Sequence, residues 1–436
     1  MLLLNRLRPF AAKLPYPVIS VLAGLAAFGA YTSMYAFRRA FAAGTFAGQQ
    51  YLHVDYKAWL VIAQVLGYML SKFYGIRFIA EVKAQNRGRY VLMLVGISWL
   101  ALLAFAFIPA PYNIVCLFVN GFPLGMIWGL VFGYLEGRRA TEFMAAVLSI
   151  SLIFASGFVK TVGRTLLTSF HVNEFLMPFA TGAIFVLPLI LFVLCLEALP
   201  PPTAQDKQQR TERRSMPPHE RRAFIIRFLP GIILTVIVYL MLTIMRDVRD
   251  NFEVEIWHGL GIKNNAIFTS IDSIISLIVL AGMGLLILVK NNLKAFGIIH
   301  LFIIGGCILA GVATLLFNAK TIEPITWMTL AGLGLYAGYV PYNAIFFERM
   351  IASFQCKSNV GFIMYVADAI GYLGSISVLL VKELGNPGVS WDVFFKDGLL
   401  ILSVVGSISA TFSLIYFWQS ARRSRVQAKP LKFSAI

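Results

Sequence analysis

Long apolar stretches separated by short polar segments recur along the whole chain. Each stretch is roughly 20 residues or longer, which is the length that an α-helix needs to cross the ~30 Å hydrocarbon core of a bilayer. The stretches are continuously apolar, whereas the strands of a membrane β-barrel are short and alternate between apolar and polar residues. We therefore predict an all-α membrane protein with twelve transmembrane helices, at residues 16–42, 57–82, 90–109, 112–136, 141–168, 174–199, 223–249, 264–290, 295–317, 323–346, 358–382 and 394–420.

The longest polar interruption lies between the sixth and seventh predicted helices, at residues 200–222, and is rich in proline, glutamine and charge. We interpret it as a solvated cytoplasmic linker, with a regulatory or partner-binding site as the alternative. It separates an N-terminal half (1–199) from a C-terminal half (223–436), which ends in a basic cytoplasmic tail. Each half contains six predicted helices.

The two halves resemble each other in two places. Arg38 and Arg246 lie at matching distances from the start of the first helix in each half. The fourth helix of each half combines glycines with aromatic residues and ends in a glutamate, Glu136 or Glu348, which is followed closely by arginine. Pseudo-symmetric halves of six helices are typical of secondary transporters, in which the halves rock around a site near the middle of the membrane.

The composition supports a membrane protein, because 59% of the residues are hydrophobic and 13% are charged, against about a quarter charged in soluble domains. Most Lys and Arg residues, which cause the net charge of +17, lie in loops on the side of the N-terminus. The positive-inside rule therefore predicts cytoplasmic termini, in the inner (cytoplasmic) membrane of the cell. We attribute the basic charge to topology and anionic lipids rather than to nucleic acid, since no aromatic-rich soluble module accompanies it. We expect a monomer.

Charged residues inside the predicted helices are candidates for function, because a charge at the bilayer centre costs about 2.5–3.5 kcal/mol. The rise of 1.5 Å per residue in a helix places Lys72 near the middle of the membrane. Arg164, Arg249 and Asp250 fall near the outer interface, where we expect them to snorkel towards water. The other candidates are Arg38, Arg39, Lys160, Arg246, Asp247, Asp272 and Asp368.

Arg38 and Arg246 are the strongest candidates for a substrate site, since matching positions in two related halves converge on the pseudo-symmetry axis. Two guanidinium groups predict an oxyanion ligand, because the planar fork of arginine binds phosphate or carboxylate through two parallel hydrogen bonds. Lys72 either faces the substrate or forms a structural ion pair with Asp272 or Asp368. Three tyrosines share a helix face with these cations and either contact the substrate or only pack the core: Tyr31, Tyr35 and Tyr68.

Two segments of the chain carry a resemblance to a known family. Residues 28–41 read FGAYTSMYAFRRAF, and residues 67–73 read GYMLSKF. These segments resemble the first two helices of the organophosphate:phosphate antiporters of the major facilitator superfamily, the family that includes glycerol-3-phosphate and hexose-phosphate transporters. The resemblance implies the major facilitator fold, exchange of a phosphorylated metabolite for inorganic phosphate, and a substrate site made of Tyr31, Tyr35, Arg38, Tyr68, Lys72 and Arg246.

These observations favour a secondary transporter of a small organic anion, with Lys160 as a further substrate-binding cation. One alternative is a proton-coupled carboxylate transporter in which Asp272, Asp368 or Glu136 titrates, with Arg39 in a coupling or structural ion pair. A transporter-like sensor that binds its ligand without moving it is another. An enzyme is not expected, because the sequence has no HExxH, GxSxG or nucleotide-binding loop. The four cysteines show no metal-ligand spacing, so we expect neither a metal nor another cofactor.

Overall fold

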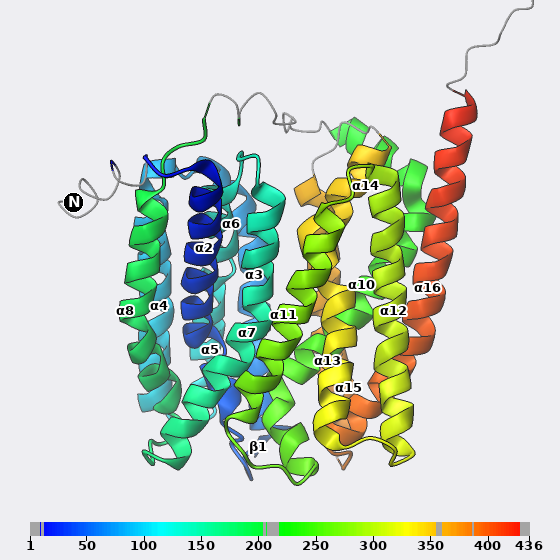
Figure 1. Ribbon diagram of the computed structural model, residues 1–436. Helices are drawn as coiled ribbons and strands as arrows, with labels where there is room; N and C mark the ends of the chain where they lie inside the picture. Colours follow the sequence, from blue (N-terminus) through cyan, green and yellow to red (C-terminus); the bar gives the residue numbers. More distant parts are fainter. Residues whose placement is uncertain are drawn as a thin grey trace, which may run out of the picture.

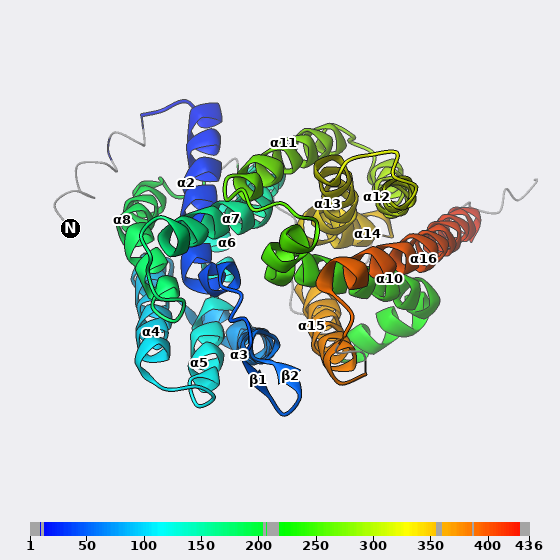
Figure 2. The same ribbon diagram turned by 90° about the horizontal axis from the view of Figure 1, so that it is seen from below.

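The computed structural model describes residues 9, 13–203, 206, 218–354, 360–385 and 388–427. These residues form two groups of long helices that lie side by side (Figure 1, Figure 2). The first group comprises α2 (Tyr16–Arg38), α3 (Tyr56–Glu81), α4 (Arg87–Phe107), α5 (Ile114–Leu124), α6 (Ile127–Leu135), α7 (Thr141–Thr168) and α8 (Met177–Ala198). The second group comprises α10 (Pro218–Gly259), α11 (Ile267–Ile287), α12 (Asn292–Asn318), α13 (Pro324–Pro341), α14 (Phe347–Ser353), α15 (Val360–Gly385) and α16 (Trp391–Gln427).

The helices account for the predicted membrane spans. Within the described residues, nine helices are both long and apolar enough to cross a membrane, when α5 and α6 are taken as one span. The comparable helices α3, α13 and α15 complete the twelve, and α13 continues through a π-helical turn (Tyr342–Phe346) into α14. The all-α architecture with two halves of six spans is therefore the one that the sequence predicts.

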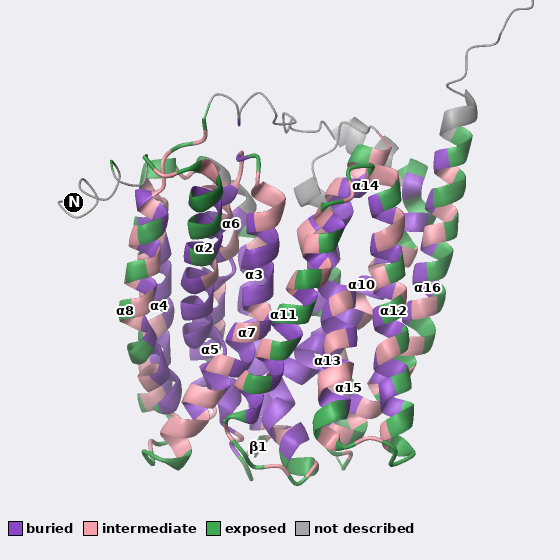
Figure 3. Ribbon diagram, viewed as in Figure 1, coloured by how far each residue is buried: buried purple, intermediate pink, exposed green. Residues whose placement is uncertain are grey.

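The bundle has two different ends. α2 begins and α16 ends at the same end, which we name the termini face (upper in Figure 1). The opposite end, the hairpin face, carries the antiparallel pair of β1 (Gln50–Tyr51) and β2 (Val54–Asp55). Between the two ends, the outward sides of the helices expose large apolar residues such as Leu100, Leu187 and Ile401, whereas the inner sides are buried (Figure 3). This exposed apolar belt fits a lipid environment.

Two helices differ clearly from their predicted bounds. The predicted helix at 112–136 divides into α5 and α6 just after Pro123, which lacks the N–H donor of a regular helix. The predicted helix at 223–249 is part of α10, which continues to Gly259 with a kink at Phe252. The predicted end at residue 249 is wrong, because polar residues beyond it, among them Glu253, are paired inside the bundle.

Most of the predicted linker (200–222) lies outside the described residues. Asp206 is described, and its carboxylate accepts hydrogen bonds from the backbone N–H and the Oγ1 of Thr203, at 2.9 and 2.7 Å, and from the backbone N–H of Arg139 at 3.0 Å. Burial opposes ionisation, but these hydrogen bonds hold the pKa of Asp206 at about 2. The start of the linker is therefore attached to the loop between α6 and α7.

Helices α3 and α5 pack backbone to backbone at two glycines. A Cβ atom on Gly67 would lie 2.2 Å from the carbonyl oxygen of Phe118, and one on Gly121 would lie 2.3 Å from that of Gln64. Small residues allow helices to approach this closely in membranes. The side chain of Gln64 in turn donates to the carbonyl oxygen of Arg38 at 2.6 Å, so the packed helices also hold the end of α2.

We predict that Gly121→Ala lowers the free energy of unfolding by about 1–3 kcal/mol, because the added methyl group forces α5 away from α3. Gly96→Ala is the matched control, since no described atom lies within 4 Å of the position of a Cβ on Gly96 in α4. Alanine there improves helix propensity by up to about 1 kcal/mol. Reversible unfolding in mixed SDS micelles measures both variants, and equal stabilities would contradict the close packing.

Candidate functional site

Arg38, the last residue of α2, carries a buried positive charge. The residue is 4% exposed, and its guanidinium carbon lies 3.7 Å from the centroid of the Tyr68 ring and 5.7 Å from that of Tyr35. Among the described residues it forms no ion pair with a carboxylate, and its Nε is buried without a hydrogen-bond partner. The described part of the protein thus leaves this charge without a counter-ion.

Four tyrosines gather around Arg38. Tyr31 and Tyr35 precede it on α2, with ring centroids 5.6 Å apart, and Tyr68 from α3 meets Tyr372 from α15 edge to face at 5.5 Å. All four are at most 5% exposed. Aromatic rings attract cations at their faces, and the phenol hydroxyls place hydrogen-bonding groups beside the charge. Sequence reasoning missed Tyr372, because no spacing along the chain connects α15 with α2.

Arg246 lies on α10, in the other half, and has a counter-ion. Its Nη2 donates to Oδ1 of the neighbouring Asp247 at 2.6 Å. Asp247 also pairs with Arg39 at 3.5 Å, and Arg39 in addition donates to the side chain of Asn251. Asp247 therefore joins Arg39 of the first half to Arg246 of the second, and the two predicted site arginines, Arg38 and Arg246, differ in their surroundings.

Lys72 on α3 pairs with Asp368 on α15. Its Nζ lies 3.4 Å from Oδ2 of Asp368 and 5.2 Å from the centroid of the Tyr68 ring. Asp368 also accepts a hydrogen bond from the hydroxyl of Tyr239. Of the two partners that the sequence offers for Lys72, the structure therefore places Asp368 beside it and Asp272 elsewhere. The pair is a second link between the halves next to Arg38.

Lys160 and Asp272 belong to a separate cluster with Arg249 and Glu253, nearer the hairpin face. Nζ of Lys160 lies 2.5 Å from Glu253, and Arg249 lies 2.7 Å from Asp272, with all four side chains fully buried. Because this cluster is separate from Arg38 and its tyrosines, we leave Lys160 out of the proposed substrate site. The expected snorkelling of Arg249 and Asp250 is wrong, since α10 continues beyond them and both are buried.

Sequence reasoning missed Glu253, because the predicted helix ends at residue 249 and places Glu253 in a loop. Arg249 and Glu253 are four residues apart, which brings side chains together on one face of a helix. This spacing is the signal that would have extended the prediction. Arg164, near the end of α7, is partly exposed, as snorkelling requires.

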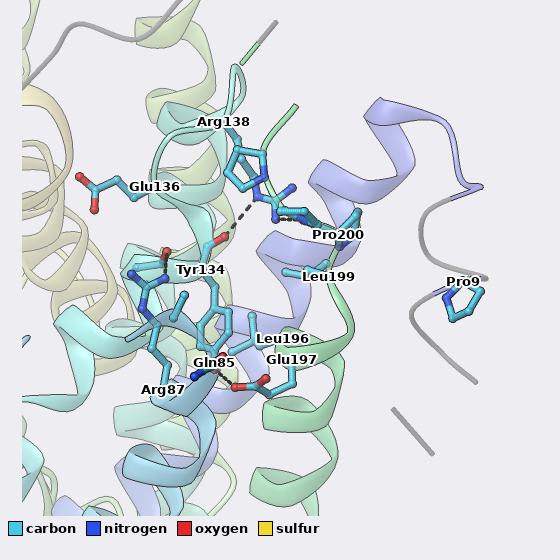
Figure 4. A pocket seen from close by; sticks show the side chains of 14 residues that line it. Pro9, Gln85, Arg87, Tyr134, Glu136, Arg138, Leu196, Glu197, Leu199 and Pro200 are labelled. Carbon is cyan, nitrogen blue, oxygen red and sulfur yellow. Dashed lines mark hydrogen bonds between the residues drawn. The ribbon is translucent and has the colours of Figure 1, made fainter. Parts of the chain in front are cut away.

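A pocket of about 680 Å³ lies at the termini face, between the ends of α4, α6 and α8 and the start of the linker (Figure 4). Arg87 donates to a backbone carbonyl of α6 at 2.6 Å, and Arg138 donates to the carbonyl of Pro200 at 2.6 Å. Glu136, a predicted coupling residue, lines this pocket, whereas Arg38 is at the other end of α2. We therefore do not place the substrate site here. No group of His, Cys, Asp and Glu in the described chain could hold a metal ion.

Comparison with known proteins identifies the fold. Residues 40–420 match a family model described as "Family of unknown function (DUF5690)". No curated protein matches the sequence. The crystal structure of a D-xylose-proton symporter resembles this structure with a TM-score of 0.62 and 14% sequence identity, over 91% of this chain and 96% of the symporter chain. The likeness confirms the predicted major facilitator fold. The finer resemblance to organophosphate:phosphate antiporters stays a prediction.

We predict that Asp368→Asn destabilises the protein, because it removes the carboxylate that pairs with the partly buried ammonium group of Lys72 while keeping an acceptor for Tyr239. The double variant Lys72→Met/Asp368→Asn is expected to be more stable than the sum of the single changes implies, by about 1–3 kcal/mol. SDS unfolding of the four proteins in this double-mutant cycle measures the coupling. Asp397→Asn, at an exposed position, is the control, and additive effects in the cycle would contradict the pair.

Proposed function

The chain belongs to the DUF5690 family and has the major facilitator fold, and we propose that it is a secondary transporter of a small organic anion. Transport follows alternating access, in which the two halves rock around a site between them. We place the hairpin face outside the cell and the termini face in the cytoplasm, in agreement with the excess of Lys and Arg in the loops of the termini face. The transporter works as a monomer in the inner membrane.

One observation carries the proposal: Arg38 is buried and, among the described residues, has no carboxylate partner. An uncompensated charge inside a protein costs several kcal/mol, so a ligand that supplies the negative charge stabilises this arrangement. A guanidinium group matches the geometry of oxyanions through two parallel hydrogen bonds. The proposed ligand is therefore an oxyanion at Arg38.

We propose a phosphorylated metabolite as the substrate and inorganic phosphate as its exchange partner. Phosphate oxygens bind Arg38, with Lys72 and Arg246 as further cations, while the tyrosine cluster contacts the organic part. Lys72 and Arg246 are held by Asp368 and Asp247 when no substrate is bound. Because these carboxylates partly neutralise Lys72 and Arg246, Arg38 is the principal anchor of the phosphate group.

Binding is coupled to movement through Asp247. This carboxylate contacts Arg246 on its own half and Arg39 on the other. A phosphate that competes with Asp247 for Arg246 changes the contact with Arg39 as well, and so changes the relative stability of the two arrangements of the halves. A ligand shifts such an equilibrium only by the difference between its affinities for the two states. This exchange of partners supplies such a difference.

We predict that Arg38→Gln lowers phosphate exchange by about 30- to 100-fold, which corresponds to losing a charge-assisted contact of roughly 2–3 kcal/mol. The measurement is uptake of radiolabelled phosphate into proteoliposomes loaded with phosphate. Arg89→Gln makes the same chemical change at an exposed position on α4 and is expected to exchange like the wild type. Arg38→Lys keeps the charge but not the planar guanidinium group, and its exchange rate should fall between those of Arg38→Gln and Arg89→Gln.

Undiminished exchange by Arg38→Gln would contradict the proposed anchor. A thermal-shift screen of phosphorylated metabolites identifies the organic substrate, because a ligand that binds only the folded state stabilises it by RT ln(1 + [L]/Kd). Stabilisation by a metabolite without exchange in proteoliposomes would contradict transport and favour a ligand sensor.

A further inference from the structure

A cluster of four charged side chains lies fully buried between the two halves, on the hairpin side of the proposed substrate site. Lys160 comes from α7 of the first half, and Arg249, Glu253 and Asp272 come from α10 and α11 of the second. Nζ of Lys160 lies 2.5 Å from Oε2 of Glu253. Nη2 of Arg249 lies 2.7 Å from Oδ1 of Asp272 and 3.4 Å from Oε1 of Glu253. The two positive and two negative charges balance.

Each carboxylate of the cluster keeps one oxygen without a donor. Among the described residues, Oε1 of Glu253 and Oδ2 of Asp272 are buried and have no hydrogen-bond partner. Gly157 on α7 leaves the space for Asp272, since a Cβ atom there would lie 2.7 Å from Oδ2. The two carboxylates share one guanidinium nitrogen, and one oxygen of each has no hydrogen-bond donor. This arrangement favours the uptake of one proton by the pair.

Most of the other charged groups near the cluster have partners of their own. Lys57 on α3 pairs with Glu255 on α10 at 2.6 Å, nearer the hairpin face. Asp250 on α10 accepts a hydrogen bond from the hydroxyl of Tyr336 on α13 at 2.6 Å. The remaining charged groups on neighbouring elements are Arg39 before the 3-10 turn at Ala40–Ala43, Arg164 on α7, Lys382 and Glu383 on α15, and Asp392 and Lys396 on α16.

The balance of charge changes when the halves separate. The first half then holds Lys160 with a charge of plus one, and the second half holds one guanidinium with two carboxylates, a charge of minus one. One proton on the carboxylate pair makes the three second-half members of the cluster neutral in sum and so weakens their attraction to Lys160. Separation at this level is therefore linked to the binding of one proton.

We propose that Glu253 and Asp272 together bind one proton, that its binding opens the hairpin face, and that its release lets Lys160 close this face again. The proton comes from water at the hairpin face and returns to water when the ion pair with Lys160 forms. The inference rests on the alternating access of the proposed function but not on the identity of the substrate.

The test measures the distance between the two halves at the hairpin face as a function of pH. Spin labels are attached at Leu52→Cys, in the hairpin of the first half, and Lys263→Cys, in the loop after α10, both of which are exposed. The four native cysteines are replaced by alanine. Double electron-electron resonance on the full-length protein in lipid nanodiscs, without substrate, gives the populations of short and long distances between pH 8 and pH 5.

The proposal expects the ratio of long to short distances to rise as the pH falls, by up to about tenfold per pH unit for one linked proton. Glu253→Gln, which has the size of the protonated acid, is expected to show the long distance already at pH 8, with the pH dependence lost. Asp272→Asn should behave in the same way. Glu255→Gln is the matched control: it removes the other ion pair of this region and should keep the wild-type pH dependence.

A wild-type pH dependence that persists in both Glu253→Gln and Asp272→Asn overturns the proton site. Opening of the wild type that does not depend on pH also overturns it, while leaving the proposed transport intact. A single short distance at every pH and in every variant, in the presence and absence of inorganic phosphate, overturns alternating access and with it both proposals.

Discussion

The account depends on one electrostatic constraint, the burial of the Arg38 charge within a membrane bundle. The residue is 4% exposed, so the charge loses most of its hydration, and the faces of the surrounding tyrosine rings compensate only part of this loss. The neighbouring cations Lys72 and Arg246 have carboxylate partners. Of these three cations, Arg38 is the one without such a partner among the described residues. The packing of α3 against α5, and the hydrogen bond from Gln64 to the carbonyl oxygen of Arg38, hold the backbone of Arg38 in place. We propose on this basis that the site receives a negative charge from outside the protein.

Charged pairs join the two halves at several levels of the bundle, and our proposals concern two of these levels. Near Arg38, Asp247 and Asp368 each contact a cation of the opposite half, through Arg39 and Lys72. Nearer the hairpin face, Glu253 contacts Lys160. Breaking a buried pair is costly unless another charge replaces the lost partner. In our proposals, an anion at the level of Arg38 and a proton at the level of Glu253 supply such replacements. Small ligands would in this way act on the contact between two large bundles.

The sequence predicted what depends on local geometry. Positions four residues apart share a helix face, which correctly brought Tyr68 together with Lys72, and the hydrophobic lengths correctly gave the spans. Contacts between helices follow from tertiary packing. The pairing of Lys72 with Asp368, and the contact of Tyr372 on α15 with Tyr68, therefore could not be derived from the spacing of residues along the chain. The end of the seventh span was wrong because hydropathy treats Glu253 and Glu255 as solvent-exposed charges. Lys160 and Lys57, from distant parts of the chain, neutralise them inside the bundle.

The most direct test of the central claim is to locate a bound oxyanion. Tungstate is a tetrahedral analogue of phosphate whose anomalous scattering identifies it in crystals of the protein. The account predicts a tungsten peak about 4 Å from the guanidinium nitrogens of Arg38, beside the rings of Tyr35 and Tyr68, because the tungstate oxygens in between accept hydrogen bonds of about 2.9 Å. Tungstate bound only elsewhere, for example in the pocket at the termini face, would contradict the assignment of Arg38 as the anchor of the substrate.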